Sequence, residues 1–245
     1  MDGVAVRVVL SMLGVLFAGV LVLVVLATLV AGPGSRTSPS DPVDRDAPPP
    51  AVAPLGADTD VVAWSRDAAG DTRIPQRTLQ AYATAELRQR ERAPECRLSW
   101  STLAGIGRGE SRHARIGGAT TGPDGRADPP IVGIALDGTD GTRRIADTDG
   151  GRLDGDPVLD CAVGPMQFLP ETWARYGADG DGDGVADPQQ VDDAALAAAG
   201  LLCAGGRDAG DGDDWWDGVL AYNASGSYAR DVWSAADYGR RTARS

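Results

Sequence analysis

The chain has 245 residues and a formal net charge of -12, and all 23 of its basic residues are arginine. The arginines form no basic patch or stripe along the sequence, which argues against nucleic-acid binding. The chain has one histidine and three cysteines with no Cys-x-x-Cys pair, so a zinc site is not expected either. Its length suffices for one ordinary domain with additional segments.

An apolar segment near the N-terminus predicts a membrane anchor. Residues 8–31 are uncharged and rich in valine and leucine, and as a helix they would span the roughly 30 Å hydrocarbon core of a bilayer. A cleavable signal peptide has a shorter apolar core, which favours an uncleaved anchor, with cleavage after Ala31 as the alternative. Arg7 favours a cytoplasmic N-terminus at residues 1–7 and an extracytoplasmic position for everything after the anchor.

Residues 32–60 are rich in proline, alanine, serine and aspartate, a composition typical of a flexible linker. We expect the globular domain at residues 61–240 and a tail at 241–245, with loose structure from Gly239 onward. Apolar residues then recur at helical spacing from Ile74, with Pro75 near the first turn. This helix should end before Pro94 and pack beside the helix that follows.

The following helix contains the sequence LAGIGRGES. Ser99 is a candidate N-cap, and four later residues share one helical face, namely Trp100, Leu103, Gly107 and Glu110. A carboxyl group on a buried face prefers its neutral form, which raises its pKa and allows proton donation near neutral pH. Glu110 is therefore the candidate catalytic acid, whereas an isolated helical glutamate is more often solvated. The glycines at 105, 107 and 109 weaken the helix and predict close approach of a backbone or a sugar ring.

Residues 114–163 are rich in glycine and aspartate with little helical period, so we expect a lid or cleft wall. Within them, 147–156 has the composition of a cation loop without its spacing, which favours plain turns. The next segments predict a turn and short helix at 164–176 and a small-residue helix at 192–203. Asp213 is the candidate cap of a helix at 215–223, and a final helix runs from about Tyr228 to Tyr238. Three tryptophans are expected in the core, Trp100, Trp173 and Trp216, whereas Tyr176 and Tyr228 fit either core packing or sugar stacking.

An acidic loop predicts a calcium site. Asp179, Asp181 and Asp183 occupy positions 1, 3 and 5 of an EF-hand-like loop, with Gly184 at position 6 and the Val185 carbonyl at position 7. Carboxylates this close repel one another unless a divalent cation lies among them. Position 12 is Gln190, so the closing ligand would be Asp193 in a longer loop. A structural calcium ion is favoured over an acidic solvated turn.

Four motifs in order, LAGIGRGES, AVGPMQFLPETWARYG, DGDGDGVADP followed by DAALAAAGLLCAGG, and LAYNASGSYARDV, resemble actinobacterial lytic murein transglycosylases of the B type. The resemblance covers residues 74–238. It implies a mainly α, lysozyme-like (goose-type) domain with an EF-hand-like calcium loop. The implied reaction cleaves the MurNAc-GlcNAc bond of peptidoglycan without water and leaves 1,6-anhydro-MurNAc ends.

The same resemblance implies roles for individual residues. Glu110 would be the single catalytic acid and base, protonating the glycosidic oxygen and then taking the proton of the muramic acid 6-hydroxyl. The implied substrate-binding residues are Ser111, Met166, Gln167, Phe168, Tyr222 and Asn223. The implied calcium ligands are Asp179, Asp181, Asp183, the Val185 carbonyl and Asp193. The implied disulfide joins Cys96 to Cys203, a pair that spacing alone leaves open. Cys161 stands where the family has arginine.

Three alternatives stay open at this point. A hydrolytic muramidase on the same scaffold would need a base such as Asp128 or Asp137. A noncatalytic module would bind peptidoglycan without cleaving it, and a peptidase built on Cys161 and His113 is a weaker option. The expected partners are peptidoglycan glycan strands and, through the N-terminal helix, the cell membrane.

Overall fold

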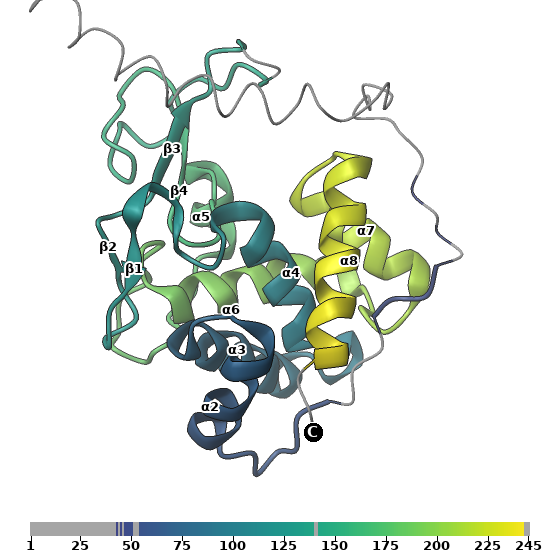
Figure 1. Cartoon of the computed structure of the whole chain (residues 1–245). Helices are drawn as coiled ribbons and strands as arrows, with labels where there is room; N and C mark the ends of the chain where they lie inside the picture. The colour runs from purple at the N-terminus through teal and green to yellow at the C-terminus, as the bar shows by residue number, and fades with distance from the viewer. Residues whose placement is uncertain (1–42, 44, 46, 51–53, 140–141, 243–245) are drawn as a thin grey trace, which may run out of the picture. The chain divides into compact units, whose positions relative to one another are not determined.

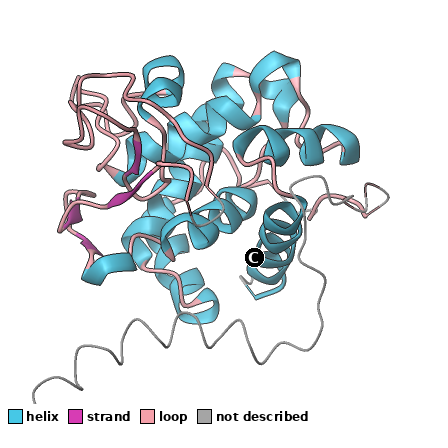
Figure 2. Cartoon of the chain, turned by 90° about the horizontal axis from the view of Figure 1, so that it is seen from above, coloured by secondary structure: helices cyan, strands magenta, loops and turns pink. Residues whose placement is uncertain are grey.

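The structure is a computed structural model that describes residues 43, 45, 47–50, 54–139 and 142–242. The predicted cytoplasmic N-terminus, the membrane anchor and the first part of the linker lie outside the described residues. Among the described residues, no helix has the length and apolar character needed to cross a membrane. This part of the chain is mainly helical, with seven α-helices and four short strands. The strands gather on one side of the helices, away from α7 and α8 in Figure 1, and the turned view in Figure 2 agrees.

The first described helix, α2 (Val61–Thr72), was not predicted. Asp60 caps it, because its Oδ1 accepts the N–H groups of Val62 and Ala63 at 3.0 Å. Its fully buried side chains are small or polar, Ser65, Ala68 and Thr72, while Val61 and Trp64 are partly buried against the core. Two large apolar residues form only a weak version of the stripe by which an amphipathic helix is identified in a sequence.

Two helices form the centre of the unit. The predicted helix after Pro75 is α3 (Gln76–Arg92), and the LAGIGRGES helix is α4 (Trp100–Ser111). α3 packs against α4 as expected and more extensively against α6, whereas α4 packs mainly against α8. The three tryptophans predicted for the core are buried. Short 3-10 turns at Pro94–Cys96, Ile116–Gly118 and Ala204–Gly206 complete the helical part.

The start of α4 is capped differently from the prediction. Ser99 precedes the helix, but its hydroxyl bonds to neighbouring hydroxyl groups and makes no cap hydrogen bond. The N–H of Trp100 instead donates to the buried Glu86 carboxylate at 2.8 Å, and the same carboxylate accepts the N–H of Leu55 at 2.8 Å. A charged acceptor within the core thus satisfies one of the free donors of α4.

The excursion at 114–163 forms two antiparallel strand pairs. β1 (Thr120–Thr121) pairs with β2 (Ala127–Asp128), and β3 (Val132–Ala135) pairs with β4 (Cys161–Val163). Between β3 and β4 the carboxylates of Asp147 and Asp149 accept backbone N–H groups in successive turns. The backbone forms the turns predicted there, and carboxylate oxygens of Asp147, Asp149 and Asp160 also lie within 4.8 Å of one another, so the cation loop stays an alternative.

Three helices complete the fold, α5 (Pro170–Tyr176), α7 (Gly212–Tyr222) and α8 (Gly226–Thr242). α7 begins earlier than predicted, because Asp211 and not Asp213 is its N-cap. α8 continues past Tyr238 to Thr242, so residues 239–242 are helical and not loose, and the boundary at 240 falls inside a helix. Thr242 Oγ1 donates to the Tyr238 carbonyl at 2.9 Å in this last turn.

Part of the predicted linker belongs to the folded unit. The indole N–H of Trp216 donates to the Ala47 carbonyl at 3.2 Å, and that of Trp233 donates to the Pro48 carbonyl at 2.8 Å. Together with the bond between Leu55 and Glu86, these contacts hold the described residues before Val61 against the helices. The linker prediction was therefore wrong for this stretch, because polar groups of α7, α8 and α3 satisfy its backbone.

The small-residue helix is α6 (Val191–Leu202), which is buried along nearly its whole length. Cys203 follows it and forms a disulfide with Cys96, the pair that the resemblance implies. The bond ties the end of α6 to the segment that leads into α4. The third cysteine, Cys161, is a buried free thiol on β4.

Candidate active site

Glu110 lies in the last turn of α4, where the chain leaves the helix abruptly. Three consecutive non-glycine residues then adopt left-handed φ angles, Arg112 (53°), His113 (62°) and Ala114 (63°). Such a run is unfavourable unless its surroundings hold it. The Ser111 hydroxyl provides a clamp, because it accepts the Ala114 N–H at 2.7 Å and donates to the Pro165 carbonyl at 2.5 Å. Glu110 is therefore fixed beside the GPMQF segment.

The glycines of α4 allow other parts of the protein to come close. A Cβ atom at Gly105 would lie 2.7 Å from the Val232 carbonyl of α8, and one at Gly107 would overlap the Tyr82 hydroxyl. Gly109 faces the ring of Tyr228, 3.2 Å from such an atom. The close approach predicted from these glycines is made by helices and tyrosines of the protein itself.

Tyr228 supplies the direct partner of Glu110. Its hydroxyl donates to Glu110 Oε1 at 2.5 Å. The tyrosine lies in the first turn of α8, where the Ser225 hydroxyl accepts its N–H at 3.3 Å. Among the described residues, no other side chain forms a hydrogen bond with the Glu110 carboxyl group. The sequence alone left Tyr228 between core packing and sugar stacking, so this role was missed.

Burial sets the protonation of Glu110. Desolvation raises the pKa of Glu110 from its ordinary value of 4.5 to about 7, and the Tyr228 hydrogen bond opposes this increase. Burial and the nearby Glu110 charge also raise the pKa of Tyr228 and of Tyr222, so both remain neutral donors. A carboxyl group with a pKa near 7 can both donate and accept a proton at neutral pH. The raised pKa agrees with the prediction made from the helical face.

The residues of the GPMQF segment lie near this carboxyl group but do not all reach solvent. Met166 is 0% and Phe168 is 2% exposed, so direct contact of these two side chains with a glycan, as predicted, does not fit the structure. Phe168 instead packs edge-on against Tyr222 and Trp173. Gln167 is partly exposed, and its amide donates to the Gly164 carbonyl at 3.0 Å.

The remaining predicted contacts are also tied to the protein. Ser111 is fully buried in its clamp, which argues against the predicted substrate contact. The Tyr222 hydroxyl donates to the Met166 carbonyl at 2.7 Å and joins the end of α7 to the GPMQF segment. Asn223 is exposed, and its Oδ1 accepts the Ser225 N–H at 3.1 Å just before α8. Contacts of Gln167, Tyr222 and Asn223 with a glycan stay predictions.

The acidic loop gathers three of the five predicted calcium ligands. Carboxylate oxygens of Asp179, Asp181 and Asp193 all lie within 4.8 Å of one another. Asp193 is fully buried at the start of α6 and accepts the N–H groups of Gly180 and Asp187 at 2.6 and 2.8 Å. Its burial raises its pKa to about 6.

The donors in this loop suit a hard cation, which prefers oxygen ligands in a flexible loop. Gly184 has the positive φ of 92° that the sharp turn of such a loop needs. One predicted carboxylate ligand stands apart from the three-carboxylate group. Asp183 Oδ1 accepts the Val185 N–H at 2.8 Å. Gln190, at the ordinary closing position, donates to Asp181 Oδ2 at 2.6 Å.

The residues required by two of the alternatives do not come together. Asp137 is exposed and accepts hydrogen bonds from Thr139, which lower its pKa, and Asp128 is exposed on β2. The Cys161 thiol has its pKa raised by burial and by neighbouring aspartates. His113 Nδ1 instead lies 3.3 Å from the Tyr82 hydroxyl. The structure gives no Cys-His pair.

Residues 159–215 match the family model described as Transglycosylase SLT domain. This match supports a lytic transglycosylase family for the chain. It covers the GPMQF segment, the acidic loop and α6, and it leaves out Glu110 and Tyr228. No curated protein and no solved structure gives a significant match.

Proposed function

We propose that this protein is a peptidoglycan lytic transglycosylase of the B type, built on a lysozyme-like domain, with Glu110 as its only acid and base. The match at residues 159–215 and the mainly helical fold support the class. The observation that carries the assignment of Glu110 is its half-buried carboxyl group with a pKa of about 7 and one tyrosine partner.

The chemistry follows from this protonation state. Neutral Glu110 donates its proton to the glycosidic oxygen, the bond to C1 of muramic acid breaks, and the sugar acquires oxocarbenium character assisted by its own N-acetyl group. The Glu110 carboxylate then removes the proton of the 6-hydroxyl as that oxygen bonds to C1. The proton count balances without water, and the product is a 1,6-anhydro sugar. Neutral Tyr228 stabilises the carboxylate between the two transfers.

Hydrolysis on the same scaffold is the second candidate. Two-carboxylate glycosidases place their acid and their base or nucleophile on either side of the bond, about 5 to 9.5 Å apart. Among the described residues, no second carboxyl group perturbs the pKa of Glu110. This observation favours the single-residue route over hydrolysis with Asp128 or Asp137.

Product mass separates the candidates. The purified full-length chain is incubated with insoluble peptidoglycan, and the masses of the released fragments are measured by mass spectrometry. The proposal expects fragments lighter by one water than hydrolytic products. Products of hydrolytic mass would identify a muramidase, and binding without release would identify a noncatalytic module. Glu110→Gln should release nothing, whereas Glu91→Gln, at an exposed position of α3, should act like the parent.

We also propose that the acidic loop binds a structural calcium ion through Asp179, Asp181 and Asp193, with Asp183 and the Val185 carbonyl as further ligands. The cluster of three carboxylates supports this proposal. A single site beside the buried start of α6 fits a structural role, because a bound ion would offset the repulsion among the carboxylates and hold the loop to the helix.

The location is proposed from the sequence. The apolar segment at 8–31 would hold the chain in the cell membrane as a single-pass protein with its domain outside the cytoplasm. A peptidoglycan substrate requires that side. Separation of membrane and soluble fractions, with protease treatment of intact cells, tests both statements.

A further inference from the structure

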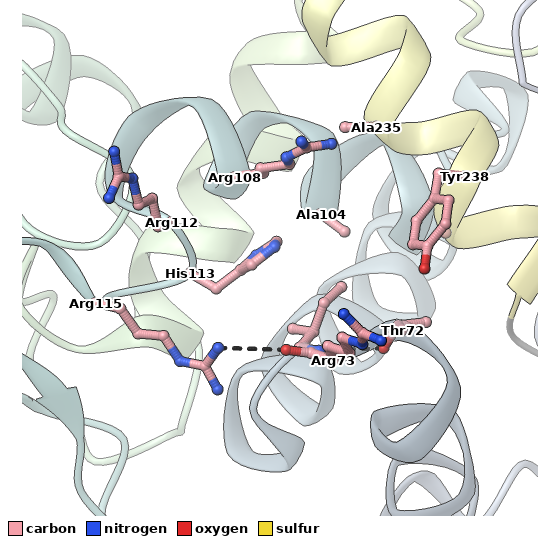
Figure 3. A pocket seen from close by; sticks show the side chains of 11 residues that line it. Thr72, Arg73, Ala104, Arg108, Arg112, His113, Arg115, Ala235 and Tyr238 are labelled. Carbon is pink, nitrogen blue, oxygen red and sulfur yellow. Dashed lines mark hydrogen bonds between the residues drawn. The ribbon is translucent and has the colours of Figure 1, made fainter. Parts of the chain in front are cut away.

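A cavity lies beside α4, away from the Glu110 carboxyl group. Its volume is about 720 Å³, and it is bounded by the turn between α2 and α3, the second half of α4 with the residues after it, and the end of α8. Its polar lining consists mainly of Arg73, Arg108, Arg112, His113, Arg115 and Tyr238, which we call the arginine pocket (Figure 3).

The arginine pocket concentrates positive charge in an acidic protein. Four arginines line it and no acidic residue does, although the chain has a formal net charge of -12. Some arginines outside the pocket pair with carboxylates, as Arg97 does with Asp208. Within the described part of the chain, none of the four pocket arginines has a carboxylate within ion-pair distance. Like charges around one cavity repel one another, so an anion in the cavity would reduce an unfavourable interaction.

The backbone around the cavity has several left-handed residues. Arg73 has a left-handed φ of 60°, and Arg112 and His113 belong to the left-handed run after α4. Arg115 reaches across to the Arg73 carbonyl with a hydrogen bond of 3.3 Å, drawn as a dashed line in Figure 3. The main chain therefore sets the points from which these side chains extend, and the hydrogen bond holds the Arg115 side chain near Arg73.

His113 adds a neutral hydrogen-bonding group. Burial, with the charges of Arg115 and Arg108, lowers the pKa of His113 to about 4, so the ring is neutral at physiological pH. Its Nδ1 faces the Tyr82 hydroxyl. When that hydroxyl donates to Nδ1, the proton of the imidazole lies on Nε2, which can donate to a ligand.

The pocket and Glu110 use different faces of α4. Ala104 and Arg108 are four residues apart and share a face of α4, and Arg112 follows directly after the helix. Glu110 is two residues beyond Arg108, which corresponds to about 200° around a helix. A ligand in the arginine pocket would thus leave the Glu110 site free for a glycan.

We propose that the arginine pocket binds oxyanion groups, carboxylate or phosphate, carried by a cell-wall polymer. Guanidinium groups bind both in a bidentate manner, and several of them around one cavity suit a ligand with more than one negative charge. This inference rests on the proposed function, since that function brings the domain to the wall. The pocket would hold the wall while Glu110 acts on a glycan from the opposite face of the same helix.

The test is sedimentation of the full-length chain with insoluble cell walls, in the Glu110→Gln background so that the walls are not digested. Arg73 and Arg112 are both changed to asparagine, which tolerates left-handed φ angles. The control changes Arg66 and Arg175 to glutamine, because both are exposed on helices outside the pocket and the net charge changes equally. We expect binding about tenfold weaker for the pocket variant and within about twofold of the parent for the control. Arg115→Gln provides a second pocket variant, and thermal melting checks that each variant is folded.

Chemically treated cell walls show whether the bound oxyanion is a phosphate or a carboxylate. One portion is stripped of phosphate polymers with hydrofluoric acid, and another has its carboxyl groups amidated. The difference between parent and pocket variant should vanish on one of the two. Equal binding by parent and both pocket variants, or a difference that survives both treatments, would overturn the proposal. Failure of the proposed function is scored separately, as the absence of released fragments with the unmutated chain.

Discussion

Replacing Glu110 with glutamine should make the protein more stable and inactive, and the gain in stability should depend on pH. In the unfolded chain this carboxyl group titrates near 4.5, and in the folded protein near 7. Between these values the folded state binds a proton that the unfolded state does not, so the stability of the parent falls as pH rises through this window. Glutamine mimics the neutral form and avoids that loss.

The interval between the two pKa values sets the size of the effect. At about 1.36 kcal/mol per pKa unit, it corresponds to about 3.4 kcal/mol. The Glu110 side chain keeps partial exposure, so water reduces the penalty and we expect a gain of about 1 to 2 kcal/mol above pH 7. The difference between variant and parent should be close to zero below pH 4.5.

Urea unfolding at several pH values from 4 to 8 measures this difference, with Glu91→Gln as the exposed control. The reasoning is refuted if Glu110→Gln gives the same change in unfolding free energy at pH 4.5 and pH 8. It is refuted equally if the variant is destabilised at pH 8, because burial would then not be the cause of the raised pKa.

Three further predictions concern other parts of the molecule. Tyr228→Phe removes a hydrogen bond that lowers the Glu110 pKa, so the alkaline limb of the activity profile should move up by roughly one pH unit; an unmoved limb would contradict this. Calcium at a hundred times its Kd should stabilise the parent by about 2.7 kcal/mol in thermal melts, but not Asp193→Asn, and an equal effect on both would exclude this site. A chain that begins at Val61 should lose about 3 kcal/mol in denaturant unfolding relative to one that begins before Val43, because Glu86 and two indole groups lose partners; equal stability would show that these contacts contribute nothing.

Local patterns were sufficient for much of the fold. Apolar residues at helical spacing located α3, α4 and α7, a run of small residues located α6, and the change in composition marked the excursion that contains the strands. α2 was missed because its fully buried residues are Ser65, Ala68 and Thr72, and Val61 and Trp64 alone give only a weak apolar period. The end of α8 was missed because its last residues are polar, and because it lies near Trp100 of α4, 3.6 Å from where a Cβ atom at Gly239 would stand, which is a tertiary arrangement.

The candidate site was likewise predicted only in part from the sequence. The face of α4 predicted a buried Glu110 with a raised pKa, because both properties follow from one helix. Its partner Tyr228 lies 118 residues away in sequence, and no spacing rule connects the two. The short motif around Met166 and Phe168 has no periodicity that distinguishes a core side chain from a cleft side chain, and the structure buries both.

The docking of the segment before α2 limits how far the site can reach. If the chain is held at Ala31 as the sequence predicts, only about a dozen residues separate the bilayer from Val43, where the described part of the folded unit begins. Even fully extended, that length spans no more than about 40 Å. Glu110 would then work on the layer of wall nearest the cell surface, and glycan strands farther out would lie beyond its range.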